Sequence, residues 1–191
     1  MKKLYASLKS LHQCLQNNGI DYAVIGGLAV AVWGEPRLTQ DIDIKVRLSR
    51  DEAERLLNAI DAEYKPFGEN PLEMLKENGI LFVQDKDGVR VYIHLSDTLF
   101  DMEVVKRASS IEIESGIVIK VCSAEDLIIY KLLSTRASDS RDFEGVVDYQ
   151  GDALDDGYII EWLRQFEIAL DDSTLVDTYQ RKRDIRNENK G

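Results

Sequence analysis

The spacing of apolar residues predicts a helix, then two short strands on either side of a second helix. The apolar positions of the first helix are Leu4, Leu8, Leu11 and Leu15. They recur at the spacing of one helical face over residues 2–17. Residues 21–25 form a short apolar run typical of a strand, and the apolar run after them predicts a helix to about Trp33. The next segment alternates apolar and polar side chains to about Val46, as a strand does.

Similar patterns divide the rest of the chain into further elements. They predict a helix over residues 50–60, a loop with a short helical turn at 64–78, strands at 80–84, 89–94, 99–105, 111–113 and 117–121, and helices at 126–134, 157–170 and 174–183. Strands and helices are mixed rather than strictly alternating, which favours an α+β fold with a mixed sheet flanked by helices. We expect residues 1–122 to form the α/β core and residues 123–191 a C-terminal helical part packed on it.

Two carboxylates stand close together in the segment that ends near Val46. Side chains alternate between the faces of a strand, so Thr39, Asp41 and Asp43 share one face. Like charges this close repel each other unless a cation lies between them or one carboxylate keeps its proton. Carboxylate oxygens suit Mg²⁺, which usually takes one or two protein carboxylates together with substrate phosphates.

A pair of glycines precedes the second helix. Gly26 and Gly27 let the backbone turn and approach a ligand closely, and the N–H groups of the helix that follows favour an anion. Alone, the glycines are also typical of a plain turn, and an isolated Asp-x-Asp of a solvated strand face. Their order, with Asp41 fifteen residues after Gly26, favours a joint site for a nucleoside triphosphate.

This stretch resembles the first motif of a known superfamily. The matching residues are Gly26, Gly27, Gly34, Arg37, Thr39, Asp41, Ile42 and Asp43. They resemble the nucleotidyltransferase superfamily related to DNA polymerase beta, and within it the minimal bacterial nucleotidyltransferases of the AbiEii toxin type. Gly27 stands where the superfamily often has serine, so a hydroxyl that could contact a phosphate is missing. The resemblance implies a nucleotidyltransferase-type sheet with a C-terminal helical extension.

A third acidic position follows in the predicted strand at 99–105. The resemblance implies that Asp101 is the third carboxylate of the metal site, because the family usually carries one acidic residue in a later strand. Glu103 is the alternative, since it lies on the same face one repeat further along the strand. An edge strand with an acidic, exposed face would carry the same two residues.

The predicted helix at 126–134 is apolar nearly all round and has Lys131 in its middle. Lysine is rarely buried without a partner. Lys131 therefore either points into the active cleft, where it meets a phosphate or carboxylate, or lays its stem along apolar surface. The AbiEii-like proteins carry a similar helix, and the resemblance implies that Lys131 binds the triphosphate.

A basic residue and an aspartate follow this helix in the family. Here they are Arg141 and Asp142, and the resemblance implies that Asp142 orients a catalytic or substrate group. Gly145 stands where a second aspartate is common, so this part of the pattern is incomplete. Asp142 is also suited to be the ion-pair partner of Lys131 or Arg136, and both interpretations stay open.

Charge and cysteine content narrow the classes of function and location. The net charge of −11 disfavours a broad nucleic-acid-binding surface, which needs a basic face. Four cations near the C-terminus, at positions 181, 182, 183 and 186, form either a local basic strip or a solvated, frayed helix end. The apolar run at 22–33 is too short to span a bilayer. Cys14 and Cys122 are predicted to be free thiols, and the expected location is the cytoplasm.

The resemblance implies a complete reaction. Asp41, Asp43 and Asp101 would hold Mg²⁺. Residues that would bind the nucleoside triphosphate are Gly26, Gly27, Arg37, Thr39 and Lys131. The nucleotidyl group would pass to RNA or protein, with the chain acting as the toxin of a toxin–antitoxin pair and an antitoxin protein as its partner. One alternative is an antibiotic-modifying nucleotidyltransferase with a small hydroxylated acceptor. Another is an inactive nucleotide-binding or regulatory protein.

Overall fold

The computed structural model of the chain describes residues 2–114 and 116–188. It divides into two compact units. The first, which we call the sheet unit, comprises Met1–Ala29 and Leu38–Cys122, and the second, the helical unit, comprises Val30–Arg37 and Ser123–Gly191. The division expected from the sequence, with residues 1–122 as the core and 123–191 as a helical part, stays a prediction. Within the described residues, no helix is long and apolar enough to cross a membrane.

The sheet unit is built on a seven-stranded sheet. Its strands are β1 (Tyr22–Ile25), β2 (Asp41–Val46), β3 (Tyr64–Pro66), β4 (Ile80–Asp85), β5 (Arg90–Leu95), β6 (Ser109–Glu114) and β7 (Ile117–Val121), in the spatial order β3-β4-β5-β2-β1-β7-β6. The central strand β2 is antiparallel to β1 and parallel to β5, and β1 is parallel to β7. The sheet is therefore mixed, and the predicted α+β class is confirmed.

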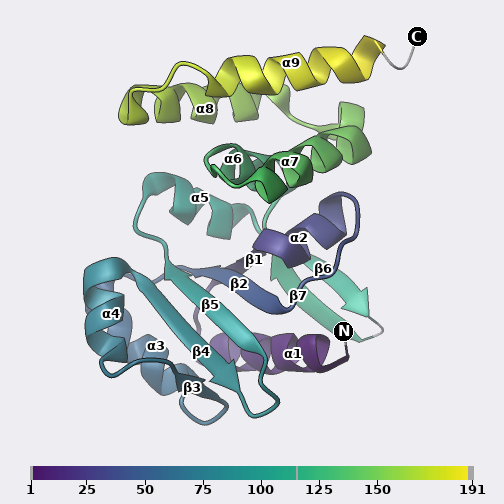
Figure 1. Cartoon of the computed structure of the whole chain (residues 1–191). Coiled ribbons are helices and arrows are strands. Elements are labelled where there is room, and N and C mark those ends of the chain that lie inside the picture. The colour runs from purple at the N-terminus through teal and green to yellow at the C-terminus, as the bar shows by residue number, and fades with distance from the viewer. Residues whose placement is uncertain (1, 115, 189–191) are drawn as a thin grey trace. The chain divides into compact units, whose positions relative to one another are not determined.

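Helices cover both faces of this sheet (Figure 1). They are α1 (Lys2–Asn17), α3 (Ala53–Ile60), α4 (Pro71–Asn78) and α5 (Leu99–Arg107), with a short 3-10 turn η1 (Arg50–Glu52). α1 and α3 lie on one face and α5 on the other. The predicted leucine face of α1 is confirmed, because Leu8, Leu11 and Leu15 are fully buried. Burial of α1 in the core follows from this apolar stripe.

The helical unit is a stack of four helices. They are α6 (Ala124–Leu132), α7 (Ala137–Gln150), α8 (Asp156–Leu170) and α9 (Leu175–Glu188), with a 3-10 turn η2 (Gly151–Ala153) between α7 and α8. α6 packs on α7 and α8, and α9 packs on α7 and α8 (Figure 1). The helix α2 (Gly26–Trp33) begins in the sheet unit and ends in the helical unit.

Three sequence-based expectations about elements are wrong or incomplete. Residues 99–105 are not a strand, because they form most of α5. The segment 64–78 is not a loop with one turn, since it contains the edge strand β3 and the two-turn helix α4. The sequence patterns also did not predict α7. Between the strands expected at 111–113 and 117–121, Ser115 lies outside the described residues.

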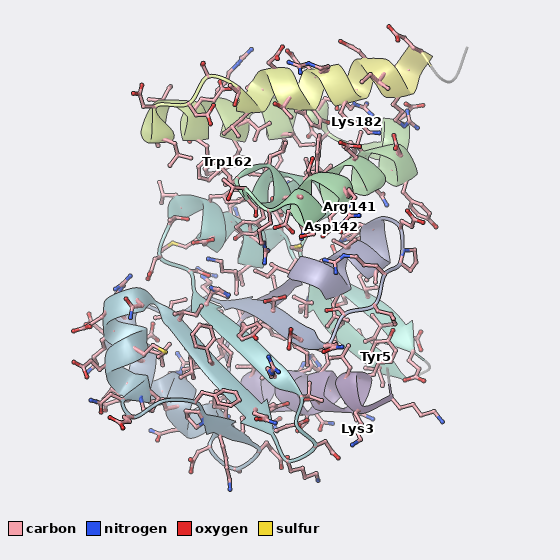
Figure 2. The ribbon with its side chains drawn as sticks, viewed as in Figure 1. Lys3, Tyr5, Arg141, Asp142, Trp162 and Lys182 are labelled. Carbon is pink, nitrogen blue, oxygen red and sulfur yellow. The ribbon has the colours of Figure 1, made fainter. Side chains whose placement is uncertain are left out.

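The basic residues near the C-terminus are not a solvated helix end. Three of them are largely buried and pair with acids from the preceding elements: Lys182 with Asp148 of α7 at 2.6 Å, Arg183 with Asp156 of α8 at 2.8 Å, and Arg186 with Asp152 of η2 at 3.1 Å. Arg181 pairs with Asp177 within α9. Lys182 lies on α9 (Figure 2). These cations of α9 therefore form ion pairs that hold α9 against the rest of the helical unit.

Candidate active site

Gly26 is the residue that the backbone requires where β1 meets α2. Its φ of 64° lies in the left-handed region, which side chains with a Cβ rarely adopt. A Cβ at this position would overlap the carboxylate of Asp43, with the Asp43 Cγ only 2.9 Å away. Glycine is therefore required at this position for two reasons. It allows the left-handed turn, and it allows Asp43 to approach the start of α2 closely.

Asp41 and Asp43 lie on one face of β2, as the alternation predicted. Ile42, Ile44 and Val46 are fully buried on the opposite face. Thr39, which we expected on the same strand face, lies two residues before β2 begins, and its hydroxyl donates to the carbonyl of Asp41 at 3.3 Å. Beside the two aspartates, β5 presents Arg90 opposite Asp41 and Tyr92 opposite Asp43. The neighbouring strand therefore contributes a cation and an aromatic ring, and no carboxylate, at these two register positions.

Asp101 lies on a helix and not on the strand that we expected. Thr98 caps α5, because its hydroxyl accepts a hydrogen bond from the Asp101 N–H at 3.0 Å. The Asp101 carboxylate is buried and pairs with the Lys45 ammonium at 2.8 Å. Lys45 shares the face of β2 that carries Asp43, so Asp101 reaches that face through Lys45. Glu103, the alternative, pairs with Lys106 at 3.0 Å.

The capping pattern at Thr98 was a signal for this helix. A threonine three residues before an aspartate, with Lys106 and Arg107 at the other end, matches the charge preference of helix termini. Phe100, Val104 and Val105 are buried at helical spacing. The alternation that predicted a strand therefore arose by chance within one amphipathic helical segment.

Burial and the charges of Lys45 and Asp101 determine the protonation state of a histidine on this face. His94 lies opposite Lys45 in the register of β2 and β5. Burial and the Lys45 ammonium lower the pKa of His94 to about 4, against an opposing effect of Asp101. His94 is therefore neutral at pH 7.

These residues fit a divalent cation held by two carboxylates. Asp41 and Asp43 are hard oxygen donors on one strand face, and the space that Gly26 leaves open lies against the Asp43 carboxylate. Within residues 2–114 and 116–188, no three acidic, histidine or cysteine side chains are arranged around a common metal position. While Asp101 is paired with Lys45, a Mg²⁺ ion at Asp41 and Asp43 would take its remaining ligands from water and substrate phosphates.

In the helical unit, Lys131 is buried between two aspartates. Its ammonium donates to Asp142 at 2.8 Å and to Asp139, and all three side chains are almost fully buried. Asp139 also accepts from Ser134 and from Arg136. The structure therefore contains the ion pair between Asp142 and Lys131, whereas Arg136 pairs with Asp139 and not with Asp142.

Asp139 is a member of this buried ion-pair cluster that the sequence did not indicate. Its segment carries no motif, and only the folding of α7 against α6 brings it to Lys131. Burial alone would raise the pKa of Asp139, but hydrogen bonds from Lys131, Ser134 and Arg136 lower it to about 2. For Asp142, hydrogen bonds from Arg37 and Lys131 likewise outweigh burial and lower the pKa. Both carboxylates are ionised at neutral pH.

Asp142 also fixes Arg37, which is 105 residues away in the sequence. Arg37 donates to it through Nε at 2.7 Å and Nη2 at 2.8 Å, a bidentate pair. The Arg37 side chain is still 43% exposed. It lines a cavity of about 350 Å³ together with Glu35, Arg141 and Gly145. Arg141 and Asp142 are neighbours in the first half of α7 (Figure 2).

The glycines of the helical unit have different roles. A Cβ at Gly34 would lie 2.9 Å from Cγ2 of Val146, so the close contact between the end of α2 and α7 requires glycine there. At Gly145, where the resembling family often has aspartate, the neighbour nearest to a Cβ would be Glu35 at 3.9 Å. Gly145 is thus not demanded by packing, and its missing side chain leaves room in the cavity.

A comparison with protein families matches residues 5–177 to the nucleotidyl transferases of unknown function (DUF2204). The chain belongs to this family. The prediction of a nucleotidyltransferase is therefore confirmed at this level. No curated protein sequence matches this nucleotidyl transferase significantly.

Several solved structures share the fold of this nucleotidyl transferase. An antigenic nucleotidyltransferase-like protein from Paracoccidioides brasiliensis has 16% identity and a TM-score of 0.54, covering 93% of each chain. The antibiotic-resistance factor ANT(2'')-Ia has 11% identity and a TM-score of 0.59, covering 89% of this chain and 96% of that one. The lincosamide antibiotic adenylyltransferase LnuA has 14% identity and a TM-score of 0.52, covering 74% and 94%. The predicted fold type is confirmed by these likenesses.

Proposed function

We propose that this nucleotidyl transferase moves a nucleotidyl group from a nucleoside triphosphate to an acceptor hydroxyl and that it requires Mg²⁺. The observation that carries the proposal is the packing of Gly26 against Asp43 beside Asp41, at the N-terminus of α2. That arrangement combines two hard carboxylates with the N–H groups of a helix start, which together suit a metal-bound triphosphate.

The sheet unit would supply the metal and phosphate contacts. Bound to Asp41 and Asp43, Mg²⁺ would supply positive charge for the reacting phosphate and the acceptor oxygen. Gly26 and Gly27 would direct backbone N–H groups at the phosphates, and Thr39 lies next to Asp41. Asp101 is proposed as a third carboxylate, which requires it to exchange its ion pair with Lys45 for the metal.

In the helical unit, Arg37 is the cation best suited to a phosphate. Its side chain is 43% exposed and already oriented by Asp142, whereas Lys131 is buried between two carboxylates. We therefore assign the phosphate contact to Arg37. Asp142 orients Arg37, and Lys131 would reach the triphosphate only after leaving Asp139 and Asp142.

Calorimetric titration with each nucleoside triphosphate tests the proposal. The wild-type chain is expected to bind at least one triphosphate only when Mg²⁺ is present, and the variant Asp41→Asn/Asp43→Asn is expected to lose that binding. Asp51→Asn/Asp61→Asn removes the same charge from exposed positions and should bind as the wild type does. If no triphosphate binds with Mg²⁺, the chain keeps the fold in a non-catalytic role.

For the acceptor, we propose a hydroxyl of RNA or protein, with the chain acting as an AbiEii-like toxin in the cytoplasm. The resemblance of the first motif and of the α6 helix supports this branch. Expression in bacteria should then arrest growth, and a neighbouring antitoxin protein should relieve the arrest. The Asp41→Asn/Asp43→Asn variant should not arrest growth.

A small hydroxylated antibiotic is the second candidate acceptor. It is favoured by the shared fold of ANT(2'')-Ia, which was solved with adenylyl-2''-tobramycin, and of LnuA, which was solved with lincomycin. Incubation with radiolabelled ATP, Mg²⁺ and either tobramycin or lincomycin distinguishes the candidates. Labelled antibiotic without growth arrest would establish the second and contradict the first.

A further inference from the structure

The sheet unit contains a cavity at the end of β1 that lies away from Gly26. Its volume is about 330 Å³. It is formed by the last turns of α1, the turn before β1, the first residue after β2, the end of α5, and β7. β1 has four residues, so the two ends of this strand are roughly 10 Å apart. The cavity is therefore separate from Asp41 and Asp43.

A buried tyrosine and a histidine form the polar part of this cavity. The Tyr22 hydroxyl lies 2.9 Å from Nδ1 of His12 and accepts a hydrogen bond from the Lys120 N–H at 3.2 Å. Burial raises the pKa of Tyr22 to about 12, and burial together with Lys120 lowers the pKa of His12. If Tyr22 donates its proton to Nδ1, both hydrogen bonds are satisfied and the proton of neutral His12 lies on Nε2, where it is available to a ligand.

Positive charge is concentrated around this cavity in a chain whose net charge is −11. Arg47, Lys106 and Lys120 line it, and Asp21 is the acidic residue among the lining residues. Lys106 also pairs with Glu103 at 3.0 Å, and its side chain is 69% exposed. The Arg47–Asp21 pair is long, at 3.7 Å, and both side chains are largely exposed. Such a pair holds its cation weakly, so Arg47 can turn to an anion. The field inside the cavity therefore favours an anionic ligand.

We propose that this cavity binds a small phosphate monoester. The phosphate lies among Arg47, Lys106 and Lys120, and its organic part lies against the buried apolar side chains of Ile20 and Val105. Phosphate suits the site because several cations can share its two negative charges and its oxygens. A volume of this size holds a small ligand and not a polymer. The proposal does not depend on the nucleotidyl transfer reaction, because it uses none of the residues assigned to that reaction.

Isothermal titration calorimetry with phenyl phosphate, in the absence of Mg²⁺, tests the proposal on the full chain. Phenyl phosphate offers both the anion and an apolar body, and inorganic phosphate offers the anion alone. We expect phenyl phosphate to bind, inorganic phosphate to bind more weakly, and Lys120→Gln to weaken phenyl phosphate binding about tenfold. The Lys120 side chain is exposed and only its backbone N–H contacts Tyr22, so this variant should fold normally.

Two controls locate the binding. Lys9→Gln removes an exposed cation from α1 outside the cavity and should leave the affinity unchanged. Asp41→Asn/Asp43→Asn alters the other site and should also leave it unchanged. The proposal is overturned if phenyl phosphate does not bind to the wild type, or if Lys120→Gln binds it as tightly as Lys9→Gln does.

Discussion

Gly26 shows how a single residue joins the backbone to the chemistry of this site. Its left-handed φ and its contact with Asp43 are separate constraints, and each forbids a side chain. Gly116 has a comparable φ of 77°, but a Cβ there would have no atom of the described residues within 4 Å, so it carries only the first constraint. The two glycines therefore allow the backbone effect to be separated from the effect on the site.

We predict that Gly26→Ala destroys metal-dependent triphosphate binding while Gly116→Ala does not. Both substitutions should lower the free energy of unfolding by about 1 kcal/mol because of the left-handed backbone. Only Gly26→Ala should also displace the Asp43 carboxylate. Urea unfolding and calorimetry of the two variants measure these effects. Equal triphosphate affinity in both variants would show that the contact between Gly26 and Asp43 does not shape the site.

We predict that loss of the Lys131 ammonium lowers the free energy of unfolding of the chain even when no ligand is bound. Lys131→Met leaves Asp139 and Asp142 buried with one partner fewer each, which should cost about 3 kcal/mol of unfolding free energy. Arg136→Met removes a cation from the same cluster, but the Arg136 side chain is 75% exposed, so its loss should cost less than about 1 kcal/mol. Urea denaturation compares the two. If Lys131→Met is as stable as the wild type, the ammonium is not needed by its two carboxylates.

We predict that the stabilisation contributed by the ion pairs of Asp139 depends on pH. Its folded pKa is about 2, below its ordinary value of 3.8, so its ion pairs stabilise the fold fully above about pH 4. As the pH falls from 4 towards 2, that stabilisation is lost because the unfolded chain takes up the proton first. Asp139→Asn lacks this contribution, so the stability difference between wild type and variant should shrink over this range. A difference that stays constant from pH 5 to pH 2 would contradict the low pKa.

Among the helices, α9 is held to its unit by ion pairs as well as by apolar contacts. Leu175 and Tyr179 are its buried residues, while Lys182, Arg183 and Arg186 reach acids on α7, η2 and α8. Arg183 also donates to the carbonyl of Gly151 at 2.9 Å. A Cβ at Gly151 would collide with the Arg186 guanidinium, so this glycine provides the space for that side chain.

We predict that Arg183→Gln loosens α9 and that Arg181→Gln does not. The first substitution removes a largely buried guanidinium and leaves Asp156 and the buried Gly151 carbonyl without this donor. The second breaks only an exposed pair within α9. Hydrogen–deuterium exchange over residues 175–188 should rise at least tenfold in Arg183→Gln and stay near the wild-type rate in Arg181→Gln. Unchanged exchange in Arg183→Gln would mean that apolar contacts suffice.

The helices and strands were predictable where one periodicity dominated. The leucines of α1 and the alternation in β2 identified their elements and faces. In α5, alternation over five residues conflicted with the Thr98 cap, and the cap was the better guide because it satisfies a backbone N–H. Partners far apart in the sequence, such as Arg37 with Asp142 and Lys131 with Asp139, depend on how helices pack and leave no local pattern.

Across the whole molecule, the distribution of charge limits what the chain can bind. The net charge is −11, and the cations concentrated in α9 are paired with acids of their own unit. Electrostatic attraction to a polyanion needs cations that are free to exchange counterions for phosphates. The fold therefore offers no broad attraction to nucleic acid among the described residues, although a specific RNA acceptor remains compatible with a local site.

We predict that the chain does not bind RNA of random sequence at physiological salt. Fluorescence anisotropy with a labelled RNA of about 20 nucleotides in about 150 mM KCl should show no binding below about 100 μM, the weak end of non-specific affinities. A true RNA acceptor should bind more tightly than this, with a shallow dependence on salt because few phosphates are contacted. Neutralising the α9 partners with Asp148→Asn/Asp152→Asn frees Lys182 and Arg186 and should raise random RNA binding. Tight, salt-sensitive binding by the wild type would mean that the paired cations of α9 remain available to phosphates.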